Sequence, residues 1–170
     1  MTLVPEDLLK YFKHAGWKPQ RSVALPKSIT DQIPGGHPAG PILSEFSGIT
    51  VGRNGAGKEC GTSDVAFQFV QLTDEADVWS DLLGTTLVGI ATVGGNHADL
   101  FVDSLERYFY ISSVHDATCF EGASFGESMR RLLLGIRCRP MLRPDQQSVT
   151  VYGEEFTADS PEVFDYGTAV

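Results

Sequence analysis

The sequence lacks several features that would place a protein of this size in a class at once. It has only three cysteines and no C-x-x-C pair, so it predicts no disulfide framework and is typical of a reducing compartment. No apolar run approaches the ~20 residues that span a bilayer. The N-terminus does not join a charged segment to an apolar one, as a signal peptide does. We therefore expect a cytoplasmic protein without membrane association.

Positive charge is also scarce. The chain carries 13 Lys and Arg against 22 Asp and Glu, which gives a formal net charge of −9. A nucleic-acid-binding protein needs a basic surface to displace the counterions of the phosphates, so we expect no nucleic-acid partner. The acidic balance is compatible with a basic protein partner, because opposite fields speed encounter. The alternative is the ordinary acidic surface of a soluble protein.

What the chain does contain is enough apolar sequence for a core. Hydrophobic residues make up 42% of its 170 residues, which fits one domain with an appended tail. Three consecutive strands with short links predict an antiparallel meander, and the grouping of helices before and after it predicts an α+β fold. We expect a domain over 1–147 and a partly ordered acidic tail over 148–170. Helices are expected over 6–15, 38–46, 75–83 and 124–135, and strands over 49–51, 65–70, 86–93, 98–103, 107–112 and 149–152.

The segment 124–135 has the most explicit helix signals in the sequence. Ser124 and Glu127 stand in the S-x-x-E spacing of a capping box, and Gly135 supplies the left-handed residue that ends a helix. The spacing of its apolar residues places them on one face, which we expect to lie on a sheet, while Arg130 and Arg131 point to solvent. The apolar residues are Phe125, Met129, Leu132 and Leu133.

A glycine-rich stretch, GRNGAGKE at 52–59, matches G-x-x-x-x-G-K of a phosphate-binding loop. The match fails at Glu59, where the motif needs Ser or Thr, and the stretch leads into a strand rather than a helix. A carboxylate would also repel phosphates. We interpret residues 52–63 as a flexible surface loop, and we expect no cofactor.

Catalytic and metal-ligating patterns are incomplete. His97-x-Asp99 is half of a deaminase zinc motif, and its second half is missing. Cys119 follows His115 by four residues in an expected loop, and this is weak support for a catalytic dyad because most such cysteines are small buried hydrophobes. The segment 138–147 is predicted to be a loop. The candidate ligands His97, Asp99, His115, Asp116 and Cys119 thus predict neither a metal site nor an active site.

Six landmarks in order nevertheless resemble a known family, the third subfamily of the SUKH superfamily of bacterial immunity proteins. No single landmark is specific, and the resemblance rests on their order and spacing over residues 5–136. They are AGW at 15–17, ILSEFSGITV at 42–51, FQF at 67–69, LLGTTLVGIATVGG at 82–95, ADLFVDSLERYFY at 98–110 and FEGASFGESMRRLLLG at 120–135.

The resemblance implies an α+β fold, with helices packed on a mixed, largely antiparallel sheet of about six strands. It also implies a non-catalytic protein that binds a cognate polymorphic-toxin domain, often a nuclease or deaminase. The 52–63 loop and the tail after Cys138 depart from the family pattern. The family pattern implies structural roles for Gly16, Trp17, Gly48, Gly84 and Gly122.

The expected partner is a basic toxin domain, bound by a monomer or weak dimer. Acidic residues of the meander and of the segment just after it are the candidate toxin contacts, with ordinary solvated charge as the alternative for each. A regulatory adaptor of the same fold, or an enzyme with a dispersed site, remains an alternative function. The candidate contacts are Asp99, Asp103, Glu106, Asp116 and Glu121.

Overall fold

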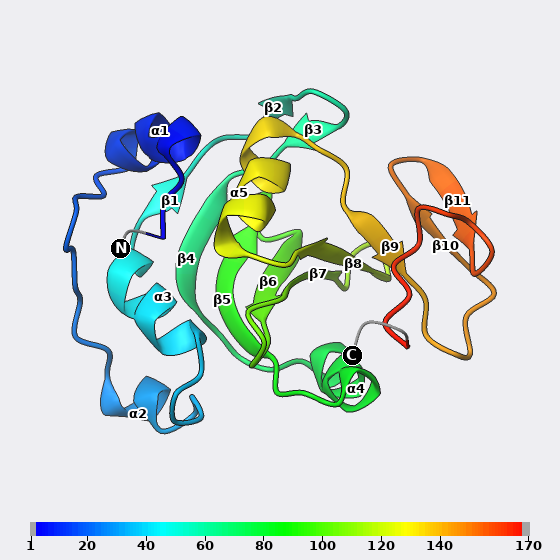
Figure 1. The fold of residues 1–170 in the computed structure, drawn as a ribbon, viewed down its shortest axis with the longest axis horizontal. Helices are drawn as coiled ribbons and strands as arrows, with labels where there is room; N and C mark the ends of the chain where they lie inside the picture. The colour runs from blue at the N-terminus through cyan, green and yellow to red at the C-terminus, as the bar shows by residue number, and fades with distance from the viewer. Residues whose placement is uncertain (1–2, 168–170) are drawn as a thin grey trace.

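A seven-stranded sheet forms the centre of the protein, whose computed structural model describes residues 3–167 (Figure 1). The strand order is β1-β4-β5-β6-β7-β8-β9, and every pair of neighbours is antiparallel. The α+β class and the largely antiparallel sheet are as predicted, and the described pairs of this seven-stranded sheet are all antiparallel. Its strands are β1 (Thr50–Val51), β4 (Val65–Val70), β5 (Val88–Val93), β6 (Ala98–Val102), β7 (Tyr108–Ser112), β8 (Ala117–Gly122) and β9 (Arg139–Met141).

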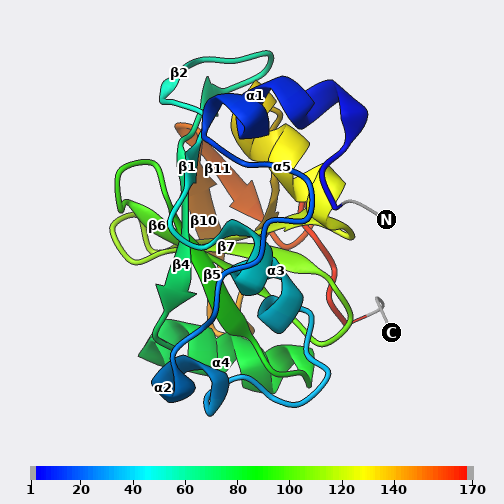
Figure 2. The same cartoon turned by 90° about the vertical axis from the view of Figure 1, so that its left-hand side faces the viewer.

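Side chains alternate along each strand, so both faces of this sheet carry apolar residues. Helices pack on both faces. Leu100 and Val102 of β6 join one core cluster with residues of α1, α3 and α5, whereas Phe101 joins a second cluster with α4. Figure 2 shows α5 and α4 at opposite ends of the sheet. The helices are η1 (Glu6–Leu8), α1 (Leu9–His14), α2 (Lys27–Thr30), α3 (Ala39–Phe46), α4 (Asp74–Leu83) and α5 (Phe125–Leu134).

Helix α5 is fixed at both ends. Ser124 Oγ accepts the Glu127 N–H at 3.2 Å, and Glu127 Oε2 accepts the Ala123 N–H at 2.9 Å. Gly135 ends the helix with φ +66°. All four apolar residues of the expected buried face are buried, and the ring of Phe125 lies within 6.2 Å of those of Phe12, Phe46, Phe67 and Tyr108.

Two strands of the central sheet were not expected from the sequence. The segment Ala117–Gly122 is β8, and all six of its residues are buried, so Cys119 lies in a strand and not in a loop. The segment 138–147, also expected to be loop, contains β9 with Pro140 at its centre. Both assignments were wrong because neither segment alternates between apolar and polar residues, the pattern that marks a half-buried strand.

The glycine-rich stretch is an ordered hairpin rather than a flexible loop, formed by β2 (Gly55–Ala56) and β3 (Gly61–Thr62). The backbone N–H groups of Lys58, Glu59 and Cys60 donate to the carbonyls of residues 134 and 135 at 2.8–3.0 Å. In a phosphate-binding loop such N–H groups would face the phosphates. Here they satisfy carbonyls that the end of a helix leaves without partners.

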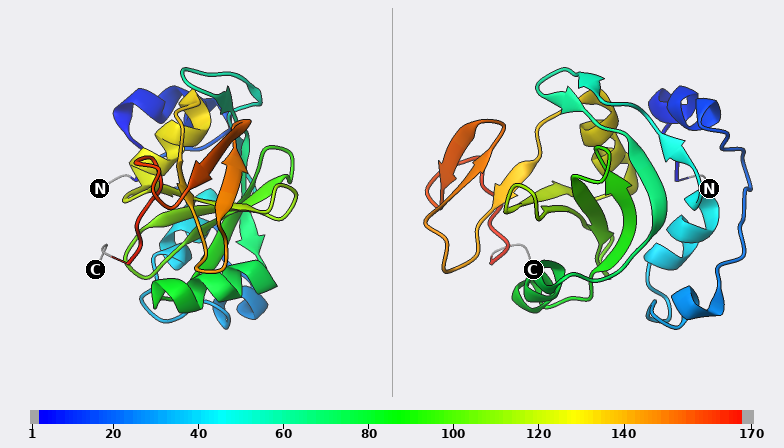
Figure 3. Two further views of the ribbon diagram at one scale, coloured as in Figure 1. Left: turned by 90° about the vertical axis from the view of Figure 1, so that its right-hand side faces the viewer. Right: turned by 180° about the vertical axis from the view of Figure 1, so that it is seen from behind.

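The chain after α5 adds a second hairpin, β10 (Ser148–Val151) and β11 (Glu154–Thr157). Figure 3 shows this hairpin at the opposite end of the molecule from α1 and α2. The segment that follows it returns to the sheet, where Phe164 stacks on Phe120 at 4.0 Å between ring centroids. Tyr166 meets Trp79 of α4 edge-on at 5.3 Å. The part of the expected acidic tail from 148 to 167 is thus packed through its aromatic residues, and the last three positions lie outside the described residues.

We predict that Gly57→Ala destabilises the protein by about 1–3 kcal/mol, because the hairpin leaves no room for a methyl group there. A Cβ at residue 57 would lie 2.3 Å from Cys60 O and 2.6 Å from Gly135 Cα. Gly55→Ala in the same hairpin is the matched control, since its nearest neighbour, Thr62 Oγ1, lies at 3.6 Å. Urea unfolding measures both changes. Equal stability of the two variants would contradict the tight docking of the hairpin on α5.

Candidate functional site

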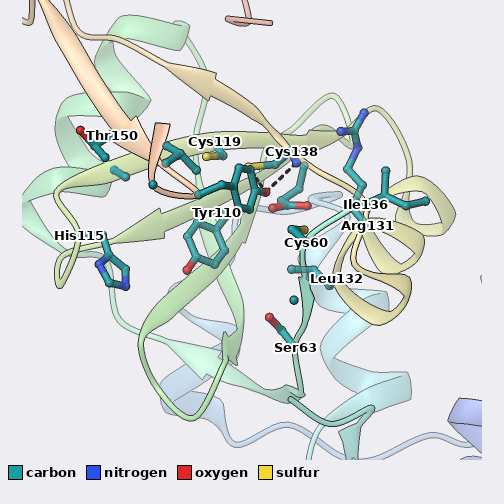
Figure 4. Close-up of a pocket in the computed structure, with 16 residues that line it drawn as sticks. Cys60, Ser63, Tyr110, His115, Cys119, Arg131, Leu132, Ile136, Cys138 and Thr150 are labelled. Carbon is teal, nitrogen blue, oxygen red and sulfur yellow. Dashed lines mark hydrogen bonds between the residues drawn. The ribbon is translucent and has the colours of Figure 1, made fainter. Parts of the chain in front are cut away.

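A cavity of about 420 Å³ lies on the α5 side of the sheet, between β7, β8, the end of α5 and the β10–β11 hairpin. Strand alternation brings its floor together, because Tyr110 of β7 is paired with Cys119 of β8 and Glu121 follows two residues later on the same face. Figure 4 shows side chains from both strands and from α5 surrounding this space. Its polar lining includes Cys60, Tyr110, His115, Cys119, Glu121, Arg131, Cys138 and Tyr152.

Glu121 is the unusual group in this cavity. Its side chain is buried, with 3% of the residue exposed, and its Oε2 has no hydrogen-bond partner. Loss of hydration raises the pKa of the Glu121 carboxyl from 4.5 to about 8, against the opposing effects of the Arg131 charge and a hydrogen bond with Cys138. The carboxyl is therefore mainly protonated at neutral pH.

Arg131 lines the same cavity, although the helix pattern predicted that it would point to solvent. Its guanidinium forms an ion pair with Glu127 at 3.0 Å and donates to the Arg137 carbonyl. Its Nε, by contrast, has no hydrogen-bond partner. The positive charge of Arg131 is thus already engaged by Glu127, which leaves Glu121 without direct neutralisation.

All three cysteines of the sequence line this cavity. The Tyr152 hydroxyl donates to Cys138 Sγ at 3.1 Å and accepts the Cys138 N–H at 2.9 Å. Burial raises the pKa of the Cys60 and Cys138 thiols, so both are protonated and poorly nucleophilic at neutral pH. Across residues 3–167, no group of three or more His, Cys, Asp or Glu is arranged to hold a metal ion.

The five acidic residues expected at a toxin contact do not form one surface. Asp103 is buried, and its carboxylate accepts the Leu105 and Arg107 N–H groups at 2.9 and 2.8 Å and pairs with Arg107 Nε at 2.7 Å. Asp103 thus stabilises the β6–β7 turn instead of facing solvent. Glu121 is enclosed in the cavity. Asp99, half-buried, and Asp116, exposed, lie towards one end of the meander, whereas Glu106 is exposed at the other.

A second hollow, of about 790 Å³, lies beside α4 at the Glu106 end of the meander. Leu72 and Leu105 line it with 47% and 66% of their surface exposed, together with Asp77 and Asp81 of α4. Sequence reasoning missed this surface, although its signal is visible: Asp74, Asp77, Val78 and Asp81 follow the i, i+3, i+4, i+7 spacing of one helix face, and α4 has no basic residue.

Comparison with known proteins identifies the family of this chain. The model of the SUKH-3 immunity proteins matches residues 4–135, most of the chain. The protein belongs to the SUKH-3 immunity protein family. Searches of the curated proteins and of the solved structures found no match.

The SUKH-3 match ends with α5, and this boundary runs through the cavity. Glu121 and Arg131 lie inside the matched region, whereas Cys138 and Tyr152 lie beyond it. The cavity is therefore built partly by the SUKH-3 domain and partly by the segment that follows it. Over residues 3–167, no helix is long and apolar enough to cross a membrane.

We predict that Glu121→Gln makes stability less dependent on pH. The folded protein holds a proton on Glu121 up to a pKa of about 8, whereas the unfolded chain releases it near 4.5. Unfolding thus becomes more favourable, by at most about 1.4 kcal/mol per pH unit, as the pH rises through this window. Gln cannot ionise, so the decline of the unfolding free energy from pH 5 to pH 8 becomes shallower.

Urea unfolding at pH 5, 6, 7 and 8 measures this difference. Glu162→Gln is the matched control, because it makes the same change at an exposed carboxylate outside the cavity. Parallel pH profiles for Glu121→Gln and the unmodified protein would show that Glu121 is not protonated in the folded state.

Proposed function

We propose that this protein confers immunity by binding and blocking a cognate toxin domain of the nuclease or deaminase type. Membership in the SUKH-3 immunity protein family supports the immunity role. The protein acts by association, without catalysis, as a cytoplasmic monomer or weak dimer. Its partner is the toxin, not a nucleic acid or a membrane.

The observation that carries the proposal is the hollow beside α4, where exposed apolar side chains adjoin the exposed acidic residues Asp77 and Asp81. Leu105, at the tip of the β6–β7 turn, and Leu72 supply the apolar contacts at its lining, and Val78 on α4 is 44% exposed. Apolar residues within a polar surround are typical of the energetic centre of a protein interface. We name this surface the α4 face: Leu72, Asp74, Asp77, Val78, Asp81, Leu105 and Glu106.

The charge of the α4 face indicates the chemistry of the partner. Three aspartates follow one side of a helix without a lysine or arginine, and Glu106 extends the acidic area beside Leu105. A toxin that binds nucleic acid presents a basic surface, which such an acidic area attracts and aligns. Of the acidic residues expected from the sequence, Glu106 is the one that belongs to this proposal. A stable complex would bury roughly 1,200–2,000 Å² in total.

We predict that reversing the charge of the α4 face weakens toxin binding. The double variant Asp77→Lys/Asp81→Lys should raise the Kd for the cognate toxin domain by at least about tenfold at low salt, and less at high salt. Growth rescue on co-expression and calorimetric titration measure the effect. Glu6→Lys/Asp159→Lys is the matched control, with the same change of net charge at exposed sites outside the α4 face. Equal losses in both variants would mean that only net charge matters.

Leu105→Ala tests the apolar part of the same surface. Leu105 is 66% exposed, so its truncation should leave the melting temperature unchanged. If Leu105 lies at the centre of the interface, the Kd should rise about tenfold or more, mainly through faster dissociation. Val114→Ala is the control, because Val114 is 61% exposed and lies in the β7–β8 turn at the other end of the meander. Unchanged affinity in Leu105→Ala would remove the α4 face from the complex.

A further inference from the structure

The cavity around Glu121 contains a polar group that the folded protein leaves unsatisfied. Glu121 lines the cavity, and its buried Oε2 has no hydrogen-bond partner. A buried carboxyl oxygen without a partner is costly, and proteins normally supply one. Arg131, whose positive charge acts on Glu121, is paired with Glu127 instead. A ligand can provide the missing partner.

The size and the remaining lining of the cavity indicate what such a ligand would look like. A volume of about 420 Å³ lies within the range of roughly 300–1,000 Å³ that is usual for small-molecule sites. Leu132, Ile136 and Val151 give the lining an apolar part, and the rings of Tyr110 and Tyr152 add aromatic surface. Aromatic faces attract cations, as Arg137 already shows at 5.2 Å from the Tyr152 ring.

We propose that this cavity binds a small organic amine, whose ammonium group pairs with Glu121 Oε2 and whose apolar body lies between Tyr110, Leu132 and Tyr152. The ammonium supplies both the charge and the hydrogen-bond donors that Glu121 lacks. The site is separate from the α4 face, so it adds a ligand-binding capacity to the proposed function and does not depend on it.

Binding of such a cation is linked to a proton. Glu121 must ionise to form the pair, and burial raises its pKa to about 8, so at pH 7 the amine displaces a proton into solvent. Affinity should rise up to tenfold per pH unit from pH 6 to about pH 8 and then level off. The titratable and charged groups that face Glu121 or act on it are Cys119 on β8, Tyr110 on β7, Arg131 and Glu127 on α5, Cys138 before β9, Tyr152 after β10, Cys60 before β3 and His115 in the β7–β8 turn.

Three probes of similar size test the charge requirement on the full chain. The probes are 2-phenylethylamine, 2-phenylethanol and phenylacetate, which carry a cation, a neutral donor and an anion on the same ring. The Kd of each is measured at pH 7 by chemical-shift titration. We expect the amine to bind at least tenfold more tightly than the alcohol and the anion. Tighter binding of phenylacetate would assign the site to Arg131, and absence of binding by the amine would also overturn the proposal.

Glu121→Gln should weaken amine binding at least tenfold, whereas Glu162→Gln should leave it unchanged. Should Glu121→Gln not fold, calorimetry of the unmodified protein in two buffers of different ionisation enthalpy gives the protons released. About one proton per bound amine at pH 6.5 supports the proposal, and none contradicts it. The variant Asp77→Lys/Asp81→Lys should bind the amine normally. This keeps a failure of the amine site distinguishable from a failure of toxin binding at the α4 face.

Discussion

The packing of Phe125 into a cluster of aromatic rings on the sheet is the contact on which the other features of this protein depend. Phe12, Phe46 and Phe67 come from α1, α3 and β4, so a single side chain joins the N-terminal helices, the sheet and α5. Once α5 is fixed, its last turn receives the β2–β3 hairpin and its Arg131 reaches the cavity. The positions of the β2–β3 hairpin and of Arg131 therefore depend on the packing of Phe125, about two turns away along the helix.

The sequence was most informative where local chemistry and tertiary packing require the same residues. The cap at Ser124 and the apolar spacing of α5 could be recognised because both are fixed within one segment. Strand β8 could not, because its two faces are both buried and its alternation is hidden by Thr118, Cys119 and Glu121. Strand β9 contains Pro140, which argues against a strand in general and is tolerated here only because β9 is at the edge.

The candidate site was harder to predict, because the position of a carboxylate depends on its partners as well as on its segment. The strand pattern places Asp99 and Asp103 on the same face. The carboxylate of Asp103, however, is bound within the turn by the backbone and side chain of Arg107. From the sequence, Glu121 was expected to be a surface charge. In the structure β8 places it in the cavity, whose lining includes residues beyond the family match. The α4 face is different, since its acidic stripe follows helical spacing and was open to recognition from the sequence alone.

The lengths of the outer strands have a consequence for how copies of this protein can meet. At one edge of the sheet β1 has only two residues, and at the other β9 has three with a proline between Arg139 and Met141. Neither edge offers a continuous row of backbone donors and acceptors to a strand from another chain. The central sheet therefore resists extension into fibres and edge-to-edge pairs, so self-association through this sheet has to use side chains rather than backbone pairing.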